Sequence, residues 1–235
     1  MEKQQRGPGG RSYVGRQMRK FVTLITVLIS SVGSQALAEK PGFLDVLLKA
    51  AEENTVEKLR IAVENGVPVD SRDGRSRTAL LIATYHNSVE AARFLIGAGA
   101  DVNAKDDLQD SPYLYAGAQG KLEILKMTVS AGADLESINR YGGTALTPAA
   151  HHGHVEVVRY MLTTNVDIDQ INHLGWTAIL EAVILGDGGP TYQRIVKLLV
   201  DAGADLSIRD NNGKTAMDNA QAKGYTQIIK ILERR

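Results

Sequence analysis

The sequence predicts an all-α solenoid of paired antiparallel helices, because the same markers return at a fixed interval along most of its 235 residues. One marker is a hydroxyl residue ahead of each helix-forming stretch, and it lies at Thr78, Ser111, Thr144, Thr177 and Thr215. The first three steps between these residues are 33 residues long, and the last is 38. A repeat of this length is typical of proteins in which one small helical unit stacks on the next.

Two further markers consist only of glycine and asparagine. The first helix of each unit is predicted to close at Asn54, Asn87, Gly120, Gly153, Gly186 or Gly224, and the second at Gly66, Gly99, Gly132, Asn165 or Gly203. Both residue types enter the left-handed backbone region readily, so we expect a left-handed cap at each helix end. Because the hydroxyl marker is a typical N-cap and follows a turn, each unit is predicted to run turn, helix, tight loop, helix, turn.

Two stretches identify the kind of repeat. Residues Thr144–Val158 read TALTPAAHHGHVEVV, and Gly99–Asn103 read GADVN. On these residues the chain resembles the ankyrin-repeat family, over roughly residues 43–232. The local departures are Ser111-Pro112-Tyr113 in place of Thr-Pro-Leu, and Asn165 in place of a glycine.

The resemblance implies about five to six units including caps, each with two antiparallel helices and a β-turn or hairpin finger. By register the ankyrin-repeat domain spans 39–235, with units at approximately 43–70, 73–103, 106–136, 139–169, 172–207 and 210–235. The first and last units are expected to be capping units with a polar outer face.

Residues 1–38 are predicted to precede the solenoid. Met1–Gln17 is rich in Gly, Arg and Gln, so we interpret it as a disordered extension or a start-site artefact. From Met18 on, two basic residues lead into the apolar run Phe21–Val32, and Ala36-Leu37-Ala38 forms an A-x-A site. Residues 18–38 therefore predict a signal peptide cleaved after Ala38, and a periplasmic or secreted bacterial protein. The alternative is an uncleaved membrane anchor, but a span needs about 20 apolar residues.

Charge and composition exclude several function classes. Met1–Ala38 holds six basic side chains and one acidic one, which leaves 21 of the 27 basic and 26 of the 27 acidic side chains in residues 39–235, a formal net charge of −5. This balance argues against a nucleic-acid partner, which needs a basic face. The absence of cysteine excludes thiol catalysis, thiolate metal sites and disulfides. Since there is also no nucleophile motif, we expect no enzyme activity, no cofactor and no resident metal.

Recognition of another protein is the function that the resemblance implies. In ankyrin-repeat proteins the concave face, made of finger tips and first helices, typically grips the partner, and aromatic side chains are good anchors there. By register this face is expected to include Arg75, Arg77, Tyr85, Tyr113, Tyr141, His151, His152, Trp176 and Lys214. The protein is expected to be a monomer without stable membrane insertion.

The alternative function is binding of a metal or a small ligand through His151, His152 and His154 or through the loop 186–191. Successive helical residues diverge by roughly 100°, so His151 and His152 do not readily share one ion. His173 on the next finger is the residue that could complete the cluster. The loop is rich in glycine but lacks a following GK[ST], so it is not a phosphate loop. Its five extra residues predict an enlarged helix-helix loop, either a tolerated insertion or an added contact.

A finer resemblance adds a physiological expectation. The stretches RYGGTALTPAAHHGHVEVVR and NHLGWTAILEAVILGDGG are similar to small bacterial ankyrin proteins such as those found alongside periplasmic catalases. That similarity implies a supporting role in periplasmic peroxide defence.

Overall fold

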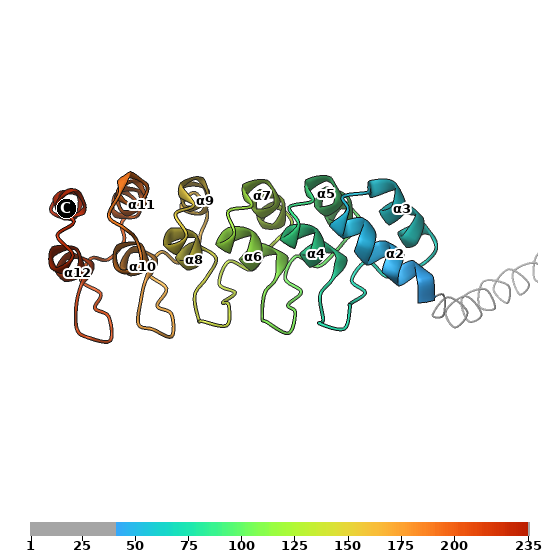
Figure 1. Cartoon of the computed structure of the whole chain (residues 1–235), viewed down its shortest axis with the longest axis horizontal. Helices are drawn as coiled ribbons and strands as arrows, with labels where there is room; N and C mark the ends of the chain where they lie inside the picture. Colours follow the sequence, from blue (N-terminus) through green and yellow to red (C-terminus); the bar gives the residue numbers. More distant parts are fainter. Residues whose placement is uncertain (1–40, 235) are drawn as a thin grey trace, which may run out of the picture. The chain divides into compact units, whose positions relative to one another are not determined.

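The computed structural model describes residues 41–234, so the predicted extension and signal peptide lie outside the described residues. In this part the chain folds into six consecutive helix pairs that stand in two rows (Figure 1). The helices are α2 Pro41–Glu52, α3 Val56–Glu64, α4 Ala79–Tyr85, α5 Val89–Gly97, α6 Pro112–Ala118, α7 Leu122–Ser130, α8 Leu146–His151, α9 Val155–Met161, α10 Ala178–Ile184, α11 Pro190–Asp201, α12 Ala216–Ala222 and α13 Thr226–Leu232. Among these described helices, each is too short or too polar to cross a bilayer.

The two rows share one apolar core. Helices α4, α6, α8, α10 and α12 pack side by side in the first row, and α3, α5, α7, α9, α11 and α13 form the second row. In α8 the side chains of Leu146, Ala149 and Ala150 are fully buried between neighbours. Burial of a leucine stabilises by about 2 kcal/mol, and alanine lets adjacent helices approach closely. The stacked pairs confirm the predicted all-α solenoid.

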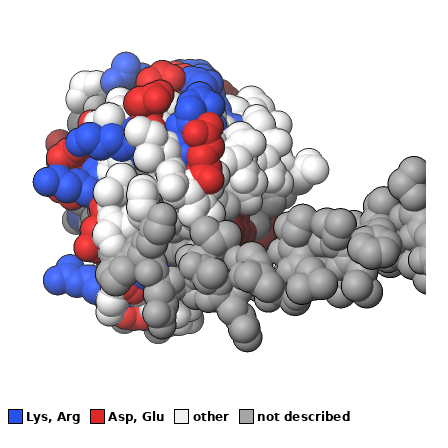
Figure 2. All heavy atoms as spheres, turned by 90° about the vertical axis from the view of Figure 1, so that its right-hand side faces the viewer, with Lys and Arg blue, Asp and Glu red and all other residues white. Residues whose placement is uncertain are grey.

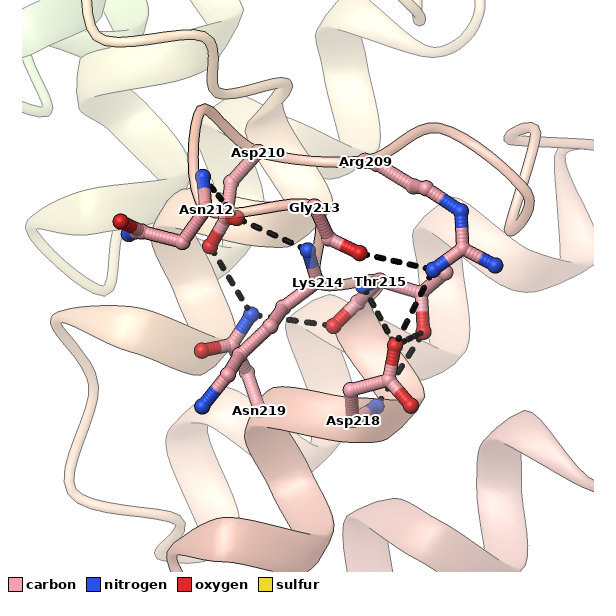
Figure 3. A network of polar contacts seen from close by, with 8 residues as sticks. All are labelled: Arg209, Asp210, Asn212, Gly213, Lys214, Thr215, Asp218 and Asn219. Atoms are coloured by element: carbon pink, nitrogen blue, oxygen red, sulfur yellow. Dashed lines mark hydrogen bonds and ion pairs between the residues drawn. The ribbon is translucent and has the colours of Figure 1, made fainter.

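The loops between pairs form fingers that project below the first row in Figure 1. One Asp or Asn side chain organises each finger: its Oδ1 accepts hydrogen bonds from the backbone N–H groups two and four residues later, at 2.8–3.2 Å. These residues are Asp73, Asp106, Asn139, Asn172 and Asp210. Figure 3 shows the last finger, where Asp210 also accepts from Asn219 and where Thr215 and Asp218 form a capping box. The fingers are thus Asx-type turns built on one repeated position.

The predicted left-handed caps are confirmed except at two positions. Positive φ angles of 55–78° occur at Asn54, Asn87, Gly120, Gly153 and Gly224, and angles of 87–98° at Gly66, Gly99, Gly132 and Gly203. The prediction is wrong for Gly186, because the left-handed residue of that loop is Gly188 at φ 73°. It is also wrong for Asn165, since the end of α9 turns instead on Thr163 and Thr164, whose hydroxyls donate to backbone carbonyls three residues back.

The hydroxyl marker caps four of the five first helices that it precedes. Thr78, Ser111, Thr177 and Thr215 each accept a hydrogen bond from the backbone N–H three residues later. Thr144 is the exception, because its Oγ1 is buried without a partner and α8 begins only at Leu146. Proline at 148 explains the delay. In the second unit Ile82 N–H donates to the Thr78 carbonyl, and Pro148 has no N–H to make the same bond.

The five extra residues of the fifth unit do more than enlarge a loop. Helix α11 begins at Pro190 and has 12 residues, whereas α9 has seven, so part of the insertion adds a turn to the helix. Gly186 is needed for close approach, because a Cβ there would lie 2.2 Å from the Ala182 carbonyl oxygen. The hydroxyl of Tyr225 donates to the Gly186 carbonyl at 2.8 Å. These contacts tie the loop to the last unit.

Polar side chains cover both ends of the stack. At the first end Lys49 and Lys58 both pair with Glu53, and Figure 2 shows basic and acidic side chains intermixed on this end. At the other end Ile228 and Leu232 of α13 are buried, while Lys230 and Glu233 are exposed. The two end units therefore close the apolar core as caps.

Candidate functional site

A groove of about 400 Å³ opens on the finger side of the first helices, across the third, fourth and fifth units. Its wall combines finger residues with side chains of α6, α8 and α10. The lining residues are Asp110, Tyr115, Ala118, Gln119, Asn139, Arg140, Tyr141, Gly143, Thr147, Pro148, His151, His152, Asn172, Leu174, Glu181 and Leu185. Its volume lies within the range of small-ligand and side-chain pockets.

One finger position of the central unit contributes no side chain to the groove. The finger position that bears Arg77, Asp110, Trp176 or Lys214 in other units is Gly143 in the fourth unit. A Cβ at Gly143 would lie 3.1 Å from the Thr147 Cβ, so the glycine also allows close packing of finger against helix. Gly143 therefore lines the groove with backbone alone.

An aromatic pair forms the wall toward the second unit. The rings of Tyr85 and Tyr115 meet edge to face with centroids 4.2 Å apart. Tyr85 Oη donates to Asp106 at 2.8 Å, and Arg77 lies over the Tyr85 ring at 5.9 Å. Burial, together with the hydrogen bond to Asp106, raises the pKa of Tyr85 far above its usual range. The pair is therefore a neutral and well-fixed wall.

A charged pair stands on the fourth finger. Arg140 lies 3.5 Å from the Asp110 carboxylate, and its guanidinium stacks on the Tyr141 ring at 5.0 Å. Burial raises the pKa of Asp110, while Arg140 acts in the opposite direction. Tyr141 is 58% exposed and presents an aromatic edge to solvent.

Glu181 on α10 is the buried carboxylate of the groove. Its side chain is 10% exposed, and Oε1 accepts a hydrogen bond from Asn172 Nδ2 at 2.7 Å. The second oxygen, Oε2, lies 3.8 Å from His151 Nδ1, beyond hydrogen-bond distance. Burial raises the pKa of Glu181 to about 7, against an opposing effect of the Asn172 hydrogen bond.

His151 and His152 line one side of the groove, and the described histidines form no metal cluster. The rings of His151 and His152 lie 4.5 Å apart, closer than the predicted divergence suggests, and His154 packs against Gly120. His152 Nδ1 is 2.7 Å from the Ala118 carbonyl oxygen and donates to it. Burial and the neighbouring His152 lower the pKa of His151. Within residues 41–234, no three His, Asp or Glu side chains are arranged to hold a metal ion.

His173 lies elsewhere than the predicted cluster. Its ring rests on Gly142, and its backbone N–H donates to the Tyr141 carbonyl. The loop 186–191 is likewise held by protein contacts, since Asp187 Oδ1 accepts from Gly189 N–H and Gln193 donates to the Gly188 carbonyl.

The structure brings together three of the nine side chains that the sequence analysis assigned to a partner. Tyr141, His151 and His152 line the groove. Tyr85 contacts the ring of Tyr115 but does not line the groove, and Arg77 forms an ion pair with Asp73. The other surface residues lie outside the groove: Arg75 and Lys214 are exposed on fingers, and Trp176 is half-buried against the core.

The assignment of Tyr113 to this face is wrong. Tyr113 is fully buried in the core, where burial raises its pKa far above the usual range and its hydroxyl has no hydrogen-bond partner. In the repeat it occupies the position of Leu80 and Leu146, which face the second row of helices. The residue two places later, Tyr115, is the one on the groove side.

The groove residues that the sequence analysis did not assign to the site include Asp110, Tyr115, Arg140 and Glu181. A signal for two of them was present, because residues 82, 115, 148 and 181 share one repeat position and alternate in chemistry from unit to unit. A position that changes from Ile to Tyr to Pro to Glu within a regular repeat is not restricted to one residue type by the fold.

Family profiles match most of the solenoid. A profile described as ankyrin repeats (many copies) matches residues 47–96, and one described as ankyrin repeats (3 copies) matches residues 113–210. The curated ankyrin repeat protein YahD of Escherichia coli (strain K12) is 42% identical over 53 residues, which are 23% of this chain and 26% of YahD. This match therefore spans only about a quarter of that relative.

Two solved structures cover far more of the chain. A crystal structure of an ankyrin repeat domain from Acinetobacter baumannii AYE is 51% identical with a TM-score of 0.78, and the match covers 80% of this chain and 95% of that one. The ankyrin repeat protein EF0377 is 47% identical with a TM-score of 0.78, covering 81% and 98% of the two chains. Ankyrin repeats are generally protein-protein interaction modules and typically non-catalytic. With this identity over nearly the whole length of both structures, the chain belongs to the ankyrin-repeat family.

Proposed function

We propose that this chain is a non-catalytic adaptor that binds another protein through the groove between its third and fifth units. The observation that carries the proposal is the lining of the groove, a hollow of about 400 Å³ that gathers aromatic and charged side chains from three units. Aromatic and arginine side chains are the usual anchors of protein interfaces. Tyr141, Tyr115 and Arg140 provide them here.

The proposal is tested by filling the groove. Ala118 lines it with a small side chain, so Ala118→Trp occupies the space without removing any charge. Glu156→Trp is the matched control, because Glu156 is exposed on the second helix α9 and does not line the groove. Cross-linked pull-down from an extract is expected to recover the partner with wild type and Glu156→Trp but to lose it with Ala118→Trp. Equal recovery with both variants would contradict binding in the groove.

Trp176→Ala tests the outer limit of the same surface. Trp176 is half-buried beside the groove, so its loss is expected to weaken capture less than Ala118→Trp does. A partner captured equally by wild type and Trp176→Ala would remove this residue from the binding face.

We further propose that the protein is exported and acts as a monomer in the periplasm or outside the cell. The basic residues before Phe21, the apolar run and the A-x-A site support this location. Amino-terminal sequencing of the exported chain is expected to start at Glu39. A mature chain that still carries Met1 would contradict cleavage, and an apparent mass of a dimer in solution would contradict the monomer.

The finer proposal is a supporting role in periplasmic peroxide defence, and it depends on the resemblance of residues 140–159 and 172–189 to small bacterial ankyrin proteins. A strain that lacks the chain is expected to survive peroxide less well and to recover with wild type but not with Ala118→Trp. Unchanged survival of the deletion strain would reject this role while leaving protein binding intact.

A further inference from the structure

We propose, building on the proposed function, that the groove receives an arginine side chain of the partner protein, and that its guanidinium pairs with the Glu181 carboxylate. Glu181 lines the groove with a side chain that is nine-tenths buried. A carboxylate buried to this degree is usually paired with a cation.

The carboxylate retains an open acceptor. Oε1 is occupied by Asn172 Nδ2, whereas Oε2 has no hydrogen bond among the described residues and its closest charged neighbour is His151 at 3.8 Å. The other buried acids of the described solenoid receive more hydrogen bonds. Asp106 and Asp210 each accept two backbone N–H groups and one side-chain donor.

The groove supplies no free cation of its own to Glu181. Arg140 is paired with Asp110 and stacked on Tyr141. Burial and His152 both lower the pKa of His151, which favours its neutral form. A buried carboxylate is most stable in the charged form when it is paired, so a cation from outside would stabilise an ionised Glu181. Its raised pKa agrees with that missing partner.

The walls around Glu181 favour a guanidinium over an ammonium. Tyr115 and Tyr141 contribute aromatic rings, and Pro148, Leu174 and Leu185 contribute apolar surface for an aliphatic stem. Arginine stacks on aromatic rings, binds a carboxylate through its planar fork and loses less hydration than lysine when it is buried. The formal net charge of −5 over residues 39–235 would also attract a basic segment.

The fold does not require an acid at this position. The equivalent residues in other units are Ile82, Tyr115, Pro148 and Asn219, and all of them support the same stack. Glu181 is therefore a feature of this groove, which is what a specificity-determining residue should be.

Selection of short random peptides tests the proposal, because it does not require the partner to be identified first. Peptides are displayed and selected on the full chain at about pH 8, where Glu181 is mainly ionised. Selection on Ala118→Trp in parallel removes peptides that bind outside the groove. The best peptide is then measured against wild type, Glu181→Gln and the control Glu156→Gln, and again with its arginine replaced by citrulline, which has the same shape without the charge.

The selected groove-binding peptides are expected to share one arginine. Glu181→Gln or the citrulline change is each expected to weaken binding by roughly tenfold or more, and the two together by little more than one alone, because they remove the same pair. Glu156→Gln should leave the affinity unchanged, and a circular dichroism melt confirms that Glu181→Gln is folded.

Each other outcome overturns the proposal in a recognisable way. Groove-binding peptides without a shared arginine, or with equal affinity for Glu181→Gln, reject the arginine but leave the proposed function standing. Failure to select any peptide that Ala118→Trp excludes rejects both.

Discussion

The fifth and sixth units form a hydrogen bond between the same two positions, but the acid and the amide change places. In the fifth unit the finger residue is the amide Asn172 and the helix residue is the acid Glu181, and Asn172 Nδ2 donates at 2.7 Å. In the sixth unit the finger residue is the acid Asp210 and the helix residue is the amide Asn219, which donates at 3.3 Å. Both pairs are nine residues apart in the chain.

The exchange places the carboxylate in opposite environments. On the finger, Asp210 accepts from the backbone N–H groups of Asn212 and Lys214, and these bonds, that from Lys214 first, lower its pKa. On the helix, Glu181 receives a single amide donor in a buried site, and burial raises its pKa to about 7. An acid in the turn therefore stabilises a finger, whereas an acid on the groove wall costs the fold free energy, and we propose that it is kept there for binding.

The largest effect is expected from Asn172→Ala. This change removes the donor to Glu181 and the acceptor for the backbone N–H groups of Leu174 and Trp176. Buried groups left without partners cost about 1–3 kcal/mol each, so the free energy of unfolding should fall by about 3–4 kcal/mol. Urea denaturation at about pH 8 measures it. A loss below about 1 kcal/mol would show that the finger does not depend on this residue.

The next effect is the pH dependence of Glu181→Gln. The pKa of Glu181 in the folded chain, about 7, lies above its ordinary value of 4.5, so folding favours the protonated form. The acid therefore carries no penalty below about pH 4.5, and it destabilises the fold increasingly as the pH rises to about 7. Glutamine is neutral throughout and should stabilise the protein by up to about 3 kcal/mol at about pH 8.

The same variant should match wild type near pH 4, because the acid is then protonated. Thermal melts of the two proteins across this pH range provide the measurement, with Glu156→Gln, exposed on α9, as the control that shifts neither curve. A gain that is independent of pH would mean that burial of the charge is not its cause.

Asp210→Asn tests the other half of the comparison. The asparagine keeps the turn acceptor but loses the charge that strengthens the bonds from Asn212, Lys214 and Asn219. The pKa of Asp210 is lowered from its ordinary value of 3.8, so its charge stabilises the fold fully above that value. The variant should therefore lose about 2 kcal/mol at neutral pH, and progressively less as the pH falls below 3.8 through the lowered pKa. Urea midpoints of wild type and variant, at neutral pH and below the ordinary pKa of 3.8, measure this loss. An equal loss at both would contradict a charge effect.

The sequence was sufficient for the fold because spacing fixes the parts that repeat. Fixed intervals located the fingers, and Gly99 or Gly132 marked a left-handed helix end for a reason that holds in every unit. The predicted left-handed position is wrong in the two units that depart from the regular spacing or residue type. At Gly186 the insertion moves the turn to Gly188, and at Asn165 two threonines satisfy the helix end instead.

The groove was only partly predictable because it depends on contacts between units. Tyr141, His151 and His152 were found by register, but the same reasoning placed the core residue Tyr113 on the surface in place of Tyr115. Glu181 lies beside His151 of the preceding unit, and this contact between units is not visible in the pattern of one repeat. Gly143 lines the groove where the other units carry a side chain, and the repeat spacing alone does not show that this position faces a hollow.

The smallest effects on the free energy of unfolding are expected at Thr215 and Thr144, where the same substitution should act in opposite directions. Thr215 begins α12 with a complete capping box, in which its hydroxyl accepts from the Asp218 N–H and the Asp218 carboxylate accepts from the Thr215 N–H. Thr144 stands at the same position of the fourth unit, but its hydroxyl is buried without a partner because Pro148 delays the helix. Thr→Val keeps the shape of the side chain in both places and removes only the hydroxyl.

Thr215→Val should therefore lower the free energy of unfolding by about 1 kcal/mol, as expected for the loss of an N-cap. Thr144→Val should leave it unchanged or raise it by up to about 1 kcal/mol, because an unpartnered hydroxyl is replaced by a methyl group. Urea denaturation of the two variants side by side decides between them. Equal destabilisation would mean that Thr144 caps α8 despite the delay imposed by Pro148, and the fourth unit would then begin its helix as the sixth does.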